Sequence, residues 1–469
     1  MNEAKRRFVG FLTLGGLMTP LLPVGIRPAF ARSEQGYPRL IHGPMAGAVQ
    51  ADSMLLWMRA SGRFPVTVLY GEKPDLSDAR ISEAVTAGPE DDYVVRIHLK
   101  GLTPNTKYYY RPYVNGAPAK YMETTPPFQF HSAPAEASRF RLGFGSCARW
   151  QEFPRQPIWQ ALELWEPALF LSLGDYIYAD TLEPGIMADL YKIQRSLPEY
   201  QRFGSSVPQL ATWDDHDYGL NNHDMENPIR EASYQLFQRY WANPGYGTAD
   251  TPGVFFQYTY GGVDFFVLDN RYHCTPNDQP DRPDKTLLGA GQKAWLKQAL
   301  KASSAPFKVL ATGGGWSWNP DSFGDDSWTS YRTERDELFD FIRDENISGV
   351  ILMSGDVHRA EANCIPRSEQ GGYDMLEFVS SGLAQDTPFP ESVETPEIRL
   401  REPYCGGNNA GILEFDLTLE DPVASFNVIN ISGQTVWDEP VQVRASELVN
   451  GHSSWASKVD PELVSPRRE

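Results

Sequence analysis

The chain has 469 residues and a formal net charge of −19. This length is enough for about two or three domains and for a large hydrophobic core. An acidic chain is a poor partner for nucleic acid or for an anionic membrane, so we predict no nucleic acid-specific binding. The charge does not exclude a small anionic substrate, because local metal ions and arginines can outweigh the global field.

Residues 1–31 have the features of an export signal. A basic segment, Lys5–Arg7, precedes the apolar stretch Phe8–Ile26, and Ala29–Ala31 is a small-x-small cleavage site. The paired arginines and the glycines and prolines of the apolar stretch favour a twin-arginine signal over a Sec signal. An uncleaved anchor helix is the alternative. We therefore expect a periplasmic or secreted protein with no stable membrane partner beyond the export machinery.

Residues 37–134 have the pattern of a small all-β domain. The predicted strands are Ala51–Ala60, Pro65–Tyr70, Tyr93–Leu99 and Lys107–Val114. The segment Gly101–Gly116 resembles a corner of fibronectin type III or immunoglobulin-like sandwiches, in which a tyrosine bonds back to the backbone. Tyr108 or Tyr110 would be that residue. Core packing is our interpretation of these aromatic residues, and carbohydrate or partner binding is the alternative.

A linker at residues 131–136 precedes a catalytic domain that we place at residues 139–445. Apolar strands there alternate with helical stretches, which is the α/β pattern. The predicted helices are Pro157–Trp165, Glu231–Trp241, Gly291–Lys301 and Thr333–Arg343. Strands return in Gly411–Val443, and the polar residues 446–469 predict a loose tail.

Five apolar runs of this domain end in residues that can bind a metal or transfer a proton. They are GFGSC (Gly143–Cys147), LSLGDYIY (Leu171–Tyr178), ATWDDHDYGLNN (Ala211–Asn222), FFVLDNR (Phe265–Arg271) and ILMSGDVHRAE (Ile351–Glu361). Each apolar part predicts a buried strand. Ligands of open α/β sheets bind at the carboxyl ends of the strands, so five such ends predict one assembled site.

The acidic cluster Asp214–Asp217 is the densest of these ends. Three carboxylates around one histidine are costly to hold together without a cation, so we favour a metal or catalytic site over a solvated loop. Asp356 and His358 stand two residues apart, which in an extended segment puts both on one face. Asp175 and Tyr178 could be aimed at one ion by a tight turn, or could be a helix cap and a packed ring.

Cysteine and arginine side chains leave more alternatives open. Cys147 could be a thiolate ligand or a small buried core residue. Arg271 and Arg149 could clamp a phosphate, because a guanidinium fork fits phosphate oxygens, or could form scaffold salt bridges. An exported protein permits disulfides, and the pair that we would choose is Cys364 with Cys405.

In this order, the motifs GSC, GDYIY, WDDHD and SGDVH resemble the alkaline phosphatase D family of the calcineurin-like metallophosphatase superfamily. The resemblance runs from about Tyr37 to Val443. It implies an α/β (α+β) catalytic domain, a two-sheet β-sandwich flanked by helices, behind a small all-β domain. It also implies hydrolysis of phosphate monoesters and diesters at a site of ferric iron and calcium rather than two zinc ions.

The resemblance assigns roles to single residues. Cys147, Tyr178 and His358 would bind the iron, and Asp175 would bridge the two metals. Asp215 and Asp356 would be ligands of the second metal.

His216 would be the catalytic histidine. One further superfamily ligand, usually a histidine, has no counterpart here, because the glycines Gly313–Gly315 follow the corresponding strand. The second site is therefore rich in oxygen, which suits calcium. Asn222 stands where relatives often have Asp.

The predicted activity is release of phosphate from a small-molecule phosphoester by metal-activated hydroxide. His216 would assist the leaving group and Arg271 would orient the phosphate. We expect a monomer. One alternative is a phosphodiesterase or phospholipase D-type esterase with the same metals, because the loops Thr181–Ser206 and Asn319–Tyr331 do not indicate leaving-group size. Another is an exported binding protein with a vestigial site.

Overall fold

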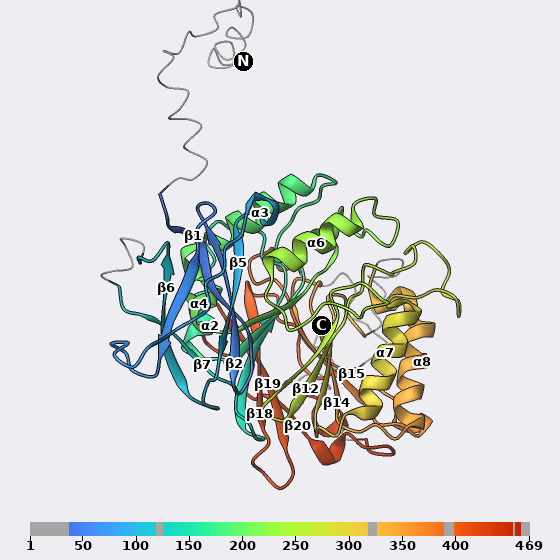
Figure 1. The fold of residues 1–469 in the computed structure, drawn as a ribbon. Coiled ribbons are helices and arrows are strands. Elements are labelled where there is room, and N and C mark those ends of the chain that lie inside the picture. Colours follow the sequence, from blue (N-terminus) through green and yellow to red (C-terminus); the bar gives the residue numbers. More distant parts are fainter. Residues whose placement is uncertain (1–36, 119–124, 318–325, 389–397, 454, 461–469) are drawn as a thin grey trace, which may run out of the picture.

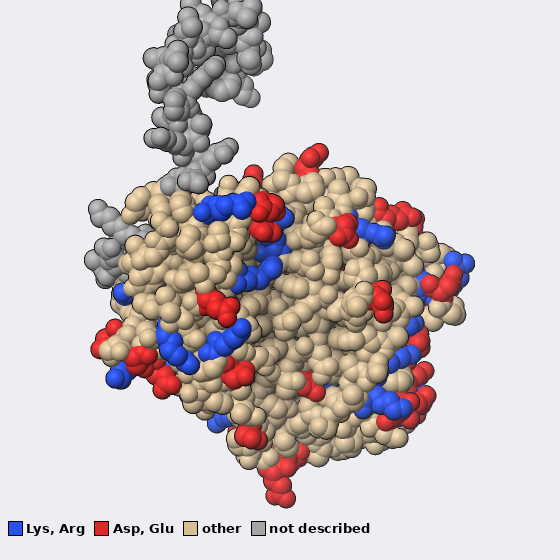
Figure 2. Space-filling view, in the orientation of Figure 1, with Lys and Arg blue, Asp and Glu red and all other residues tan. Residues whose placement is uncertain are grey.

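The computed structural model describes residues 37–118, 125–317, 326–388, 398–453 and 455–460. The expected export signal, residues 1–31, lies outside these ranges. Among the described residues, no helix is long and apolar enough to cross a bilayer. Acidic and basic side chains are interspersed on the face in Figure 2 rather than gathered into one acidic surface.

The N-terminal unit consists of two antiparallel sheets within the described residues (Figure 1). The first sheet has the order β1 (Leu40–Val49), β2 (Ser53–Ala60), β5 (Val94–Lys100). The second has the order β4 (Arg80–Ile81), β3 (Val66–Gly71), β6 (Lys107–Val114), β7 (Phe128–His131). The four predicted strands are present. The sequence did not predict β1, β4 and β7.

Strand β6 shows how the sequence builds this unit. Tyr108 and Tyr110 are buried, and Tyr109 between them is partly exposed, which is the alternation of a strand with one covered face. The Tyr108 hydroxyl accepts a hydrogen bond from the Thr103 backbone N–H at 2.9 Å, so of the two candidate tyrosines Tyr108 is the one that bonds back to the backbone of its own unit. The Tyr110 hydroxyl instead donates to the Ser205 carbonyl at 2.6 Å and joins this unit to the next one.

Two mixed sheets form the second unit, as far as the chain is described. One has the order β10 (Gln209–Thr212), β9 (Leu169–Leu173), β8 (Arg139–Gly145), β18 (Asn409–Asp416), β19 (Val423–Asn430), β20 (Val441–Arg444). The other has the order β11 (Phe256–Tyr260), β12 (Val263–Val267), β13 (Lys308–Ala311), β14 (Val350–Ser354), β16 (Met375–Ser380), β15 (Ala360–Ile365), β17 (Ile398–Arg399).

The two sheets face each other across an aromatic core. Phe378 of β16 stacks on Phe426 of β19 with ring centroids 4.5 Å apart, and Phe140 of β8 meets Tyr260 of β11 at 4.9 Å. Burial of such large apolar rings is the main force that holds stacked sheets together. The expected two-sheet arrangement is therefore present.

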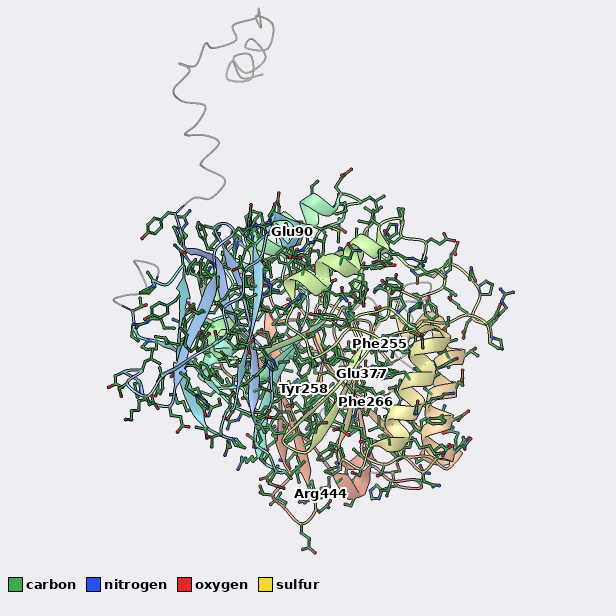
Figure 3. All side chains as sticks on the ribbon, in the orientation of Figure 1. Glu90, Phe255, Tyr258, Phe266, Glu377 and Arg444 are labelled. Carbon is green, nitrogen blue, oxygen red and sulfur yellow. The ribbon has the colours of Figure 1, made fainter. Side chains whose placement is uncertain are left out.

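Helices cover the outer faces of the sheets. Helices α7 (Gly289–Ala302) and α8 (Arg332–Asp344) lie against the second sheet (Figure 1). Trp295 of α7 meets Phe255 and Phe266, which Figure 3 labels beside this helix. Helices α2 (Ile158–Leu164) and α6 (Arg230–Tyr240) complete the predicted set.

Three expectations about this unit were wrong. Thr181–Ser206 contains α3 (Pro184–Arg195) and α4 (Pro198–Ser206) instead of a loop. Each helix begins at its proline, which is compatible with a helix there because the backbone N–H of the first helical position has no acceptor within the helix. The tail is not loose where it is described: Leu448 is buried and the Asp460 N–H donates to the Leu400 carbonyl.

The expected disulfide is the third. Cys364 and Cys405 are thiols. Tyr404 pairs with Ala360, so Cys405 lies beside the end of β15 that is four residues from Cys364. That separation is about 13 Å at the usual rise of a strand, and a disulfide needs Cα atoms within about 7 Å.

Candidate metal centre

The predicted ligands gather where parallel strands of both sheets end. Strands β8, β9 and β10 are parallel to one another in one sheet, and β12, β13 and β14 in the other, so their carboxyl ends lie on one edge of each. The residues that follow turn sharply. Cys147, Asp175, Asp356 and His358 all have positive φ angles, of 64°, 52°, 66° and 54°. Non-glycine residues rarely adopt this conformation, and such strain is concentrated at functional sites.

The first group of ligands contains Cys147, Asp175 and His358, whose ligand atoms lie within 4.8 Å of one another. The Cys147 sulfur is 3.3 Å from Asp175 Oδ2. Tyr178 joins this group, because its hydroxyl is 3.2 Å from His358 Nε2. The four residues predicted to surround the first metal are thus brought together.

The electrostatics of this group favour a bound cation. Burial and the Asp356 carboxylate raise the pKa of the Cys147 thiol to about 11. Burial also raises the pKa of Asp175 well above its usual value. A nearby positive ion reverses both shifts, because it stabilises the thiolate and the carboxylate. Among the described residues Asp175 Oδ1 is buried without a hydrogen-bond partner, as an oxygen reserved for a metal would be.

The second group contains Asp175 again, with Asp215 and His216. Asp215 opens the short helix α5 (Asp215–Tyr218), and its Oδ2 accepts the Asn222 backbone N–H at 2.7 Å. His216 Nδ1 is 2.7 Å from Asp180 Oδ1. Burial lowers the pKa of His216, but the carboxylates of Asp175, Asp180 and Asp215 outweigh it and raise the pKa to about 10. The sequence did not identify Asp180.

Asp217 connects the two ligand loops. Its carboxylate accepts the backbone N–H groups of Tyr176 at 3.3 Å and Ile177 at 3.1 Å, in the loop after β9. It also accepts the N–H of Asp214, in the loop after β10, at 3.3 Å. The third aspartate of the WDDHD motif therefore holds the backbone of both loops in register.

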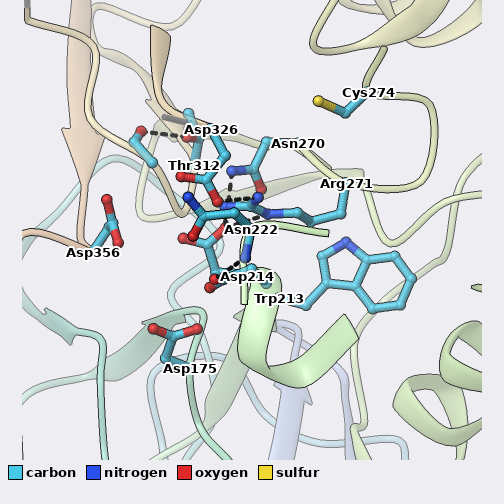
Figure 4. A network of polar contacts seen from close by, with 12 residues as sticks. Asp175, Trp213, Asp214, Asn222, Asn270, Arg271, Cys274, Thr312, Asp326 and Asp356 are labelled. Carbon is cyan, nitrogen blue, oxygen red and sulfur yellow. Dashed lines mark hydrogen bonds and ion pairs between the residues drawn. The ribbon is translucent and has the colours of Figure 1, made fainter. Parts of the chain in front are cut away.

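Arg271 is not placed as a phosphate clamp, which corrects the expectation. Its side chain is completely buried. The guanidinium bonds to Asp214 through Nε and Nη2 and to Asp326 through Nη1 (Figure 4). Asn270 also donates to Asp214 Oδ1, at 3.1 Å. Because its charge is matched by two buried carboxylates, Arg271 is a structural residue behind the centre.

Asp326 is a further residue that the sequence did not reveal. Its carboxylate forms a third acidic group with Asp214 and Asp215. It follows no apolar run, so no local pattern distinguished it from a surface acid. Asp356 lies outside the three groups, but it faces the same region from the side opposite Arg271 (Figure 4). Burial and the carboxylates of Asp326, Asp214 and Asp215 raise its pKa well above the usual value.

The glycine run after β13 leaves room for Asp214. A Cβ added to Gly313 would lie 2.5 Å from Asp214 Cγ. The sequence has glycines where the superfamily usually has a further histidine ligand. In the structure, Asp214 occupies the volume that a side chain at Gly313 would need. The centre as a whole contains one group of candidate ligands with sulfur, nitrogen and oxygen atoms. A second group beside it offers mainly carboxylate oxygens.

Comparison with known proteins agrees with this geometry. Residues 142–419 match the PhoD-like phosphatase family, and residues 26–125 match the N-terminal domain of PhoD-like phosphatases. Alkaline phosphatase D of Bacillus subtilis (strain 168) is 25% identical over 385 residues, which cover 68% of this chain and 64% of that protein. The match thus spans less than two thirds of that relative.

Two solved structures have the same fold. The structure of PhoD has a TM-score of 0.73 and 21% identity, covering 89% of this chain and 93% of its own. A purple acid phosphatase from seeds of yellow lupin (Lupinus luteus) has a TM-score of 0.60 and 13% identity, covering 92% and 77%. Because the family match spans more than half of the chain and includes all four motifs, the chain belongs to the PhoD-like phosphatase family, a family of phosphoric ester hydrolases.

Proposed function

We propose that this protein is an exported, metal-dependent phosphoester hydrolase that releases phosphate from small-molecule monoesters, diesters or both. The observation that carries the proposal is the position of Asp175, whose carboxylate lies between the group of Cys147 and His358 and the group of Asp215 and His216. One carboxylate shared by two groups is the arrangement expected of a bridging ligand between two metals, and paired metals are suited to phosphoryl transfer.

The chemistry of the ligands supports iron and calcium. A thiol, a phenol, an imidazole and a carboxylate from Cys147, Tyr178, His358 and Asp175 suit a ferric ion. Asp215 and Asp356 would complete an oxygen-rich second site, and hard cations such as calcium prefer oxygen. Bound metal ions would hold the phosphate oxygens, offset their charge and activate water for in-line attack.

Among the described residues, His216 is the one best placed to transfer a proton. Asp180 bonds to Nδ1, which fixes the ring and leaves Nε2 for the leaving-group oxygen. The ring also packs on Tyr178 with centroids 4.1 Å apart, and its side chain is only 14% exposed. A protonated His216 held in this way would donate to the departing alkoxide and would be shielded from bulk water.

The first prediction tests the shared carboxylate. Asp175→Asn keeps the size of the side chain but removes the charge, so we expect metal content to fall and turnover of a chromogenic phosphate monoester to drop at least about 100-fold. Asp374→Asn is the control, since Asp374 is also buried but bonds to Ser453 and the Arg367 backbone far from the centre. Normal activity and metal content in the Asp175 variant would show that the site assignment is wrong.

Export and architecture complete the proposal. The basic and apolar segments within residues 1–31 support twin-arginine export to the periplasm or medium, and replacing Arg6 and Arg7 by lysine should leave the protein inside the cell.

The three- and four-stranded sheets and the corner at Tyr108 support a fibronectin type III-like N-terminal unit. We also propose that the protein is monomeric, which light scattering can test.

A further inference from the structure

Arg149 is a cation that the proposed reaction does not yet use. It follows the ligand Cys147 by two residues, and its guanidinium lies over the ring of Tyr178, 5.4 Å from the centroid. Its side chain is 36% exposed, whereas Arg271 is completely buried. Arg149 therefore stands at the solvent side of the first ligand group rather than behind the centre.

The backbone holds Arg149 in this place. Its N–H donates to the Ala384 carbonyl at 2.9 Å, and its carbonyl accepts the Phe153 N–H at 3.0 Å. Next to it, Gln151 donates to the Tyr178 carbonyl at 2.6 Å. The backbone that carries the guanidinium is thus fixed to the loop that carries Tyr178, which keeps the base of the Arg149 side chain beside the centre.

The bonding capacity of the guanidinium is largely unused. Nη2 lies 3.1 Å from Glu152 Oε1, a pair between two partly exposed side chains that is worth at most about 1 kcal/mol. Nε is buried and, within the described residues, has no acceptor. A guanidinium fork fits the two oxygens of a carboxylate or phosphate, and an incoming anion can displace a weakly held glutamate.

We propose that Arg149 is a substrate-positioning residue that binds a second anionic group of the substrate, with Glu152 occupying its place until substrate arrives. The preferred substrate class is then a phosphoester that carries another carboxylate or phosphate near the scissile group. Several carboxylates surround the centre and would repel such a group, and the Arg149 guanidinium would offset this repulsion at the edge of the centre. This inference rests on the hydrolase activity proposed above.

The test compares two substrates that differ by one carboxylate, phosphoglycerate and glycerol phosphate. Arg149→Met should raise KM for phosphoglycerate by about 10-fold or more, the value of a charge-assisted hydrogen bond, and change KM for glycerol phosphate less than about twofold. Arg149→Lys should lie between, because it keeps the charge and loses the fork. Glu152→Gln should lower KM for phosphoglycerate, since it removes the competitor. Arg63→Met is the control, since Arg63 also pairs with one glutamate, Glu90, but both side chains are exposed and lie in the N-terminal unit.

Two results would overturn the role of Arg149. Equal effects of Arg149→Met on both substrates would mean that it does not sense the second anion. Altered iron content or visible absorption in that variant would mean that it only supports Tyr178. Calorimetric binding of the same two compounds gives the comparison without turnover. A protein that binds phosphoglycerate through Arg149 but hydrolyses neither compound would refute the hydrolase proposal alone.

Discussion

At the residue scale, the neighbouring side chain of Asp214 explains why position 313 is a glycine. Asp214 is held by Arg271 and Asn270, so it cannot move to make room for a side chain. We expect Gly313→Ala to reduce the free energy of unfolding by about 1–3 kcal/mol, as other overpacked sites do, and to weaken binding of the proposed second metal. Denaturant unfolding and metal analysis check this. Gly185→Ala is the control, because its Cβ would meet nothing within 4 Å, and equal losses in both variants would contradict the explanation.

Tyr108 stabilises a corner of the N-terminal unit through its hydroxyl group. Tyr108→Phe keeps the ring and leaves the Thr103 N–H without its 2.9 Å acceptor, so we expect a loss of about 1–3 kcal/mol in the free energy of unfolding. Tyr109→Phe in the same strand is the matched control, since Tyr109 is only partly buried. If both variants were equally stable in denaturant, the corner bond would have no measurable value.

At the element scale, the site depends on how α5 is joined to the loop after β9. Asp217→Ala would leave the N–H groups of Tyr176, Ile177 and Asp214 without this acceptor. We expect the free energy of unfolding to fall by about 3–5 kcal/mol and metal content to fall with it, although Asp217 itself is not a ligand. Asp217→Asn should recover part of both, because its amide oxygen can still accept.

A surface aspartate gives the comparison for this prediction. Asp421 accepts two bonds from Ser446 at an exposed position, so Asp421→Ala should lower stability by well under about 1 kcal/mol and leave the metals unchanged. Full metal content in Asp217→Ala would show that the two loops keep their register without the carboxylate.

At the scale of the whole molecule, the two units share a buried interface. The Arg195 guanidinium of α3 lies 4.6 Å from the centroid of the Trp57 ring in the N-terminal unit, and 4.7 Å and 5.3 Å from those of Trp241 and Tyr176. Tyr258 donates to the Val49 carbonyl across the same boundary, and Figure 3 shows it beside the strands of the N-terminal unit. Tyr176 adjoins Asp175, so this interface reaches the loop that carries the proposed bridging ligand.

We therefore expect one cooperative thermal transition for both units. Arg195→Met should lower its midpoint, with a loss of about 2–4 kcal/mol, because it removes a desolvated cation from three rings and a bond to the Tyr240 carbonyl. Scanning calorimetry measures this. Two separate transitions in the unaltered protein would show that the units fold independently.

The sequence by itself determined the features that depend on local pattern. These features are the strict alternation in β6, the helical periodicity in α7 and α8, and the apolar runs that end at Cys147 and Asp175. Each one depends only on residues that are close together in the sequence, and such residues determine the local backbone conformation. These strand ends predicted the centre, because parallel strands in a sheet end on the same edge.

Only the tertiary structure decided which charges meet. Arg271 pairs with Asp214 and Asp326, each more than fifty residues away, and Asp180 reaches His216 from the next loop. Such pairings follow from sheet order and loop path, which no local pattern contains, so an arginine that resembles a phosphate clamp is in fact buried. The distance between Cys364 and Cys405 was decided in the same way, by the register of β15 with the chain at Tyr404.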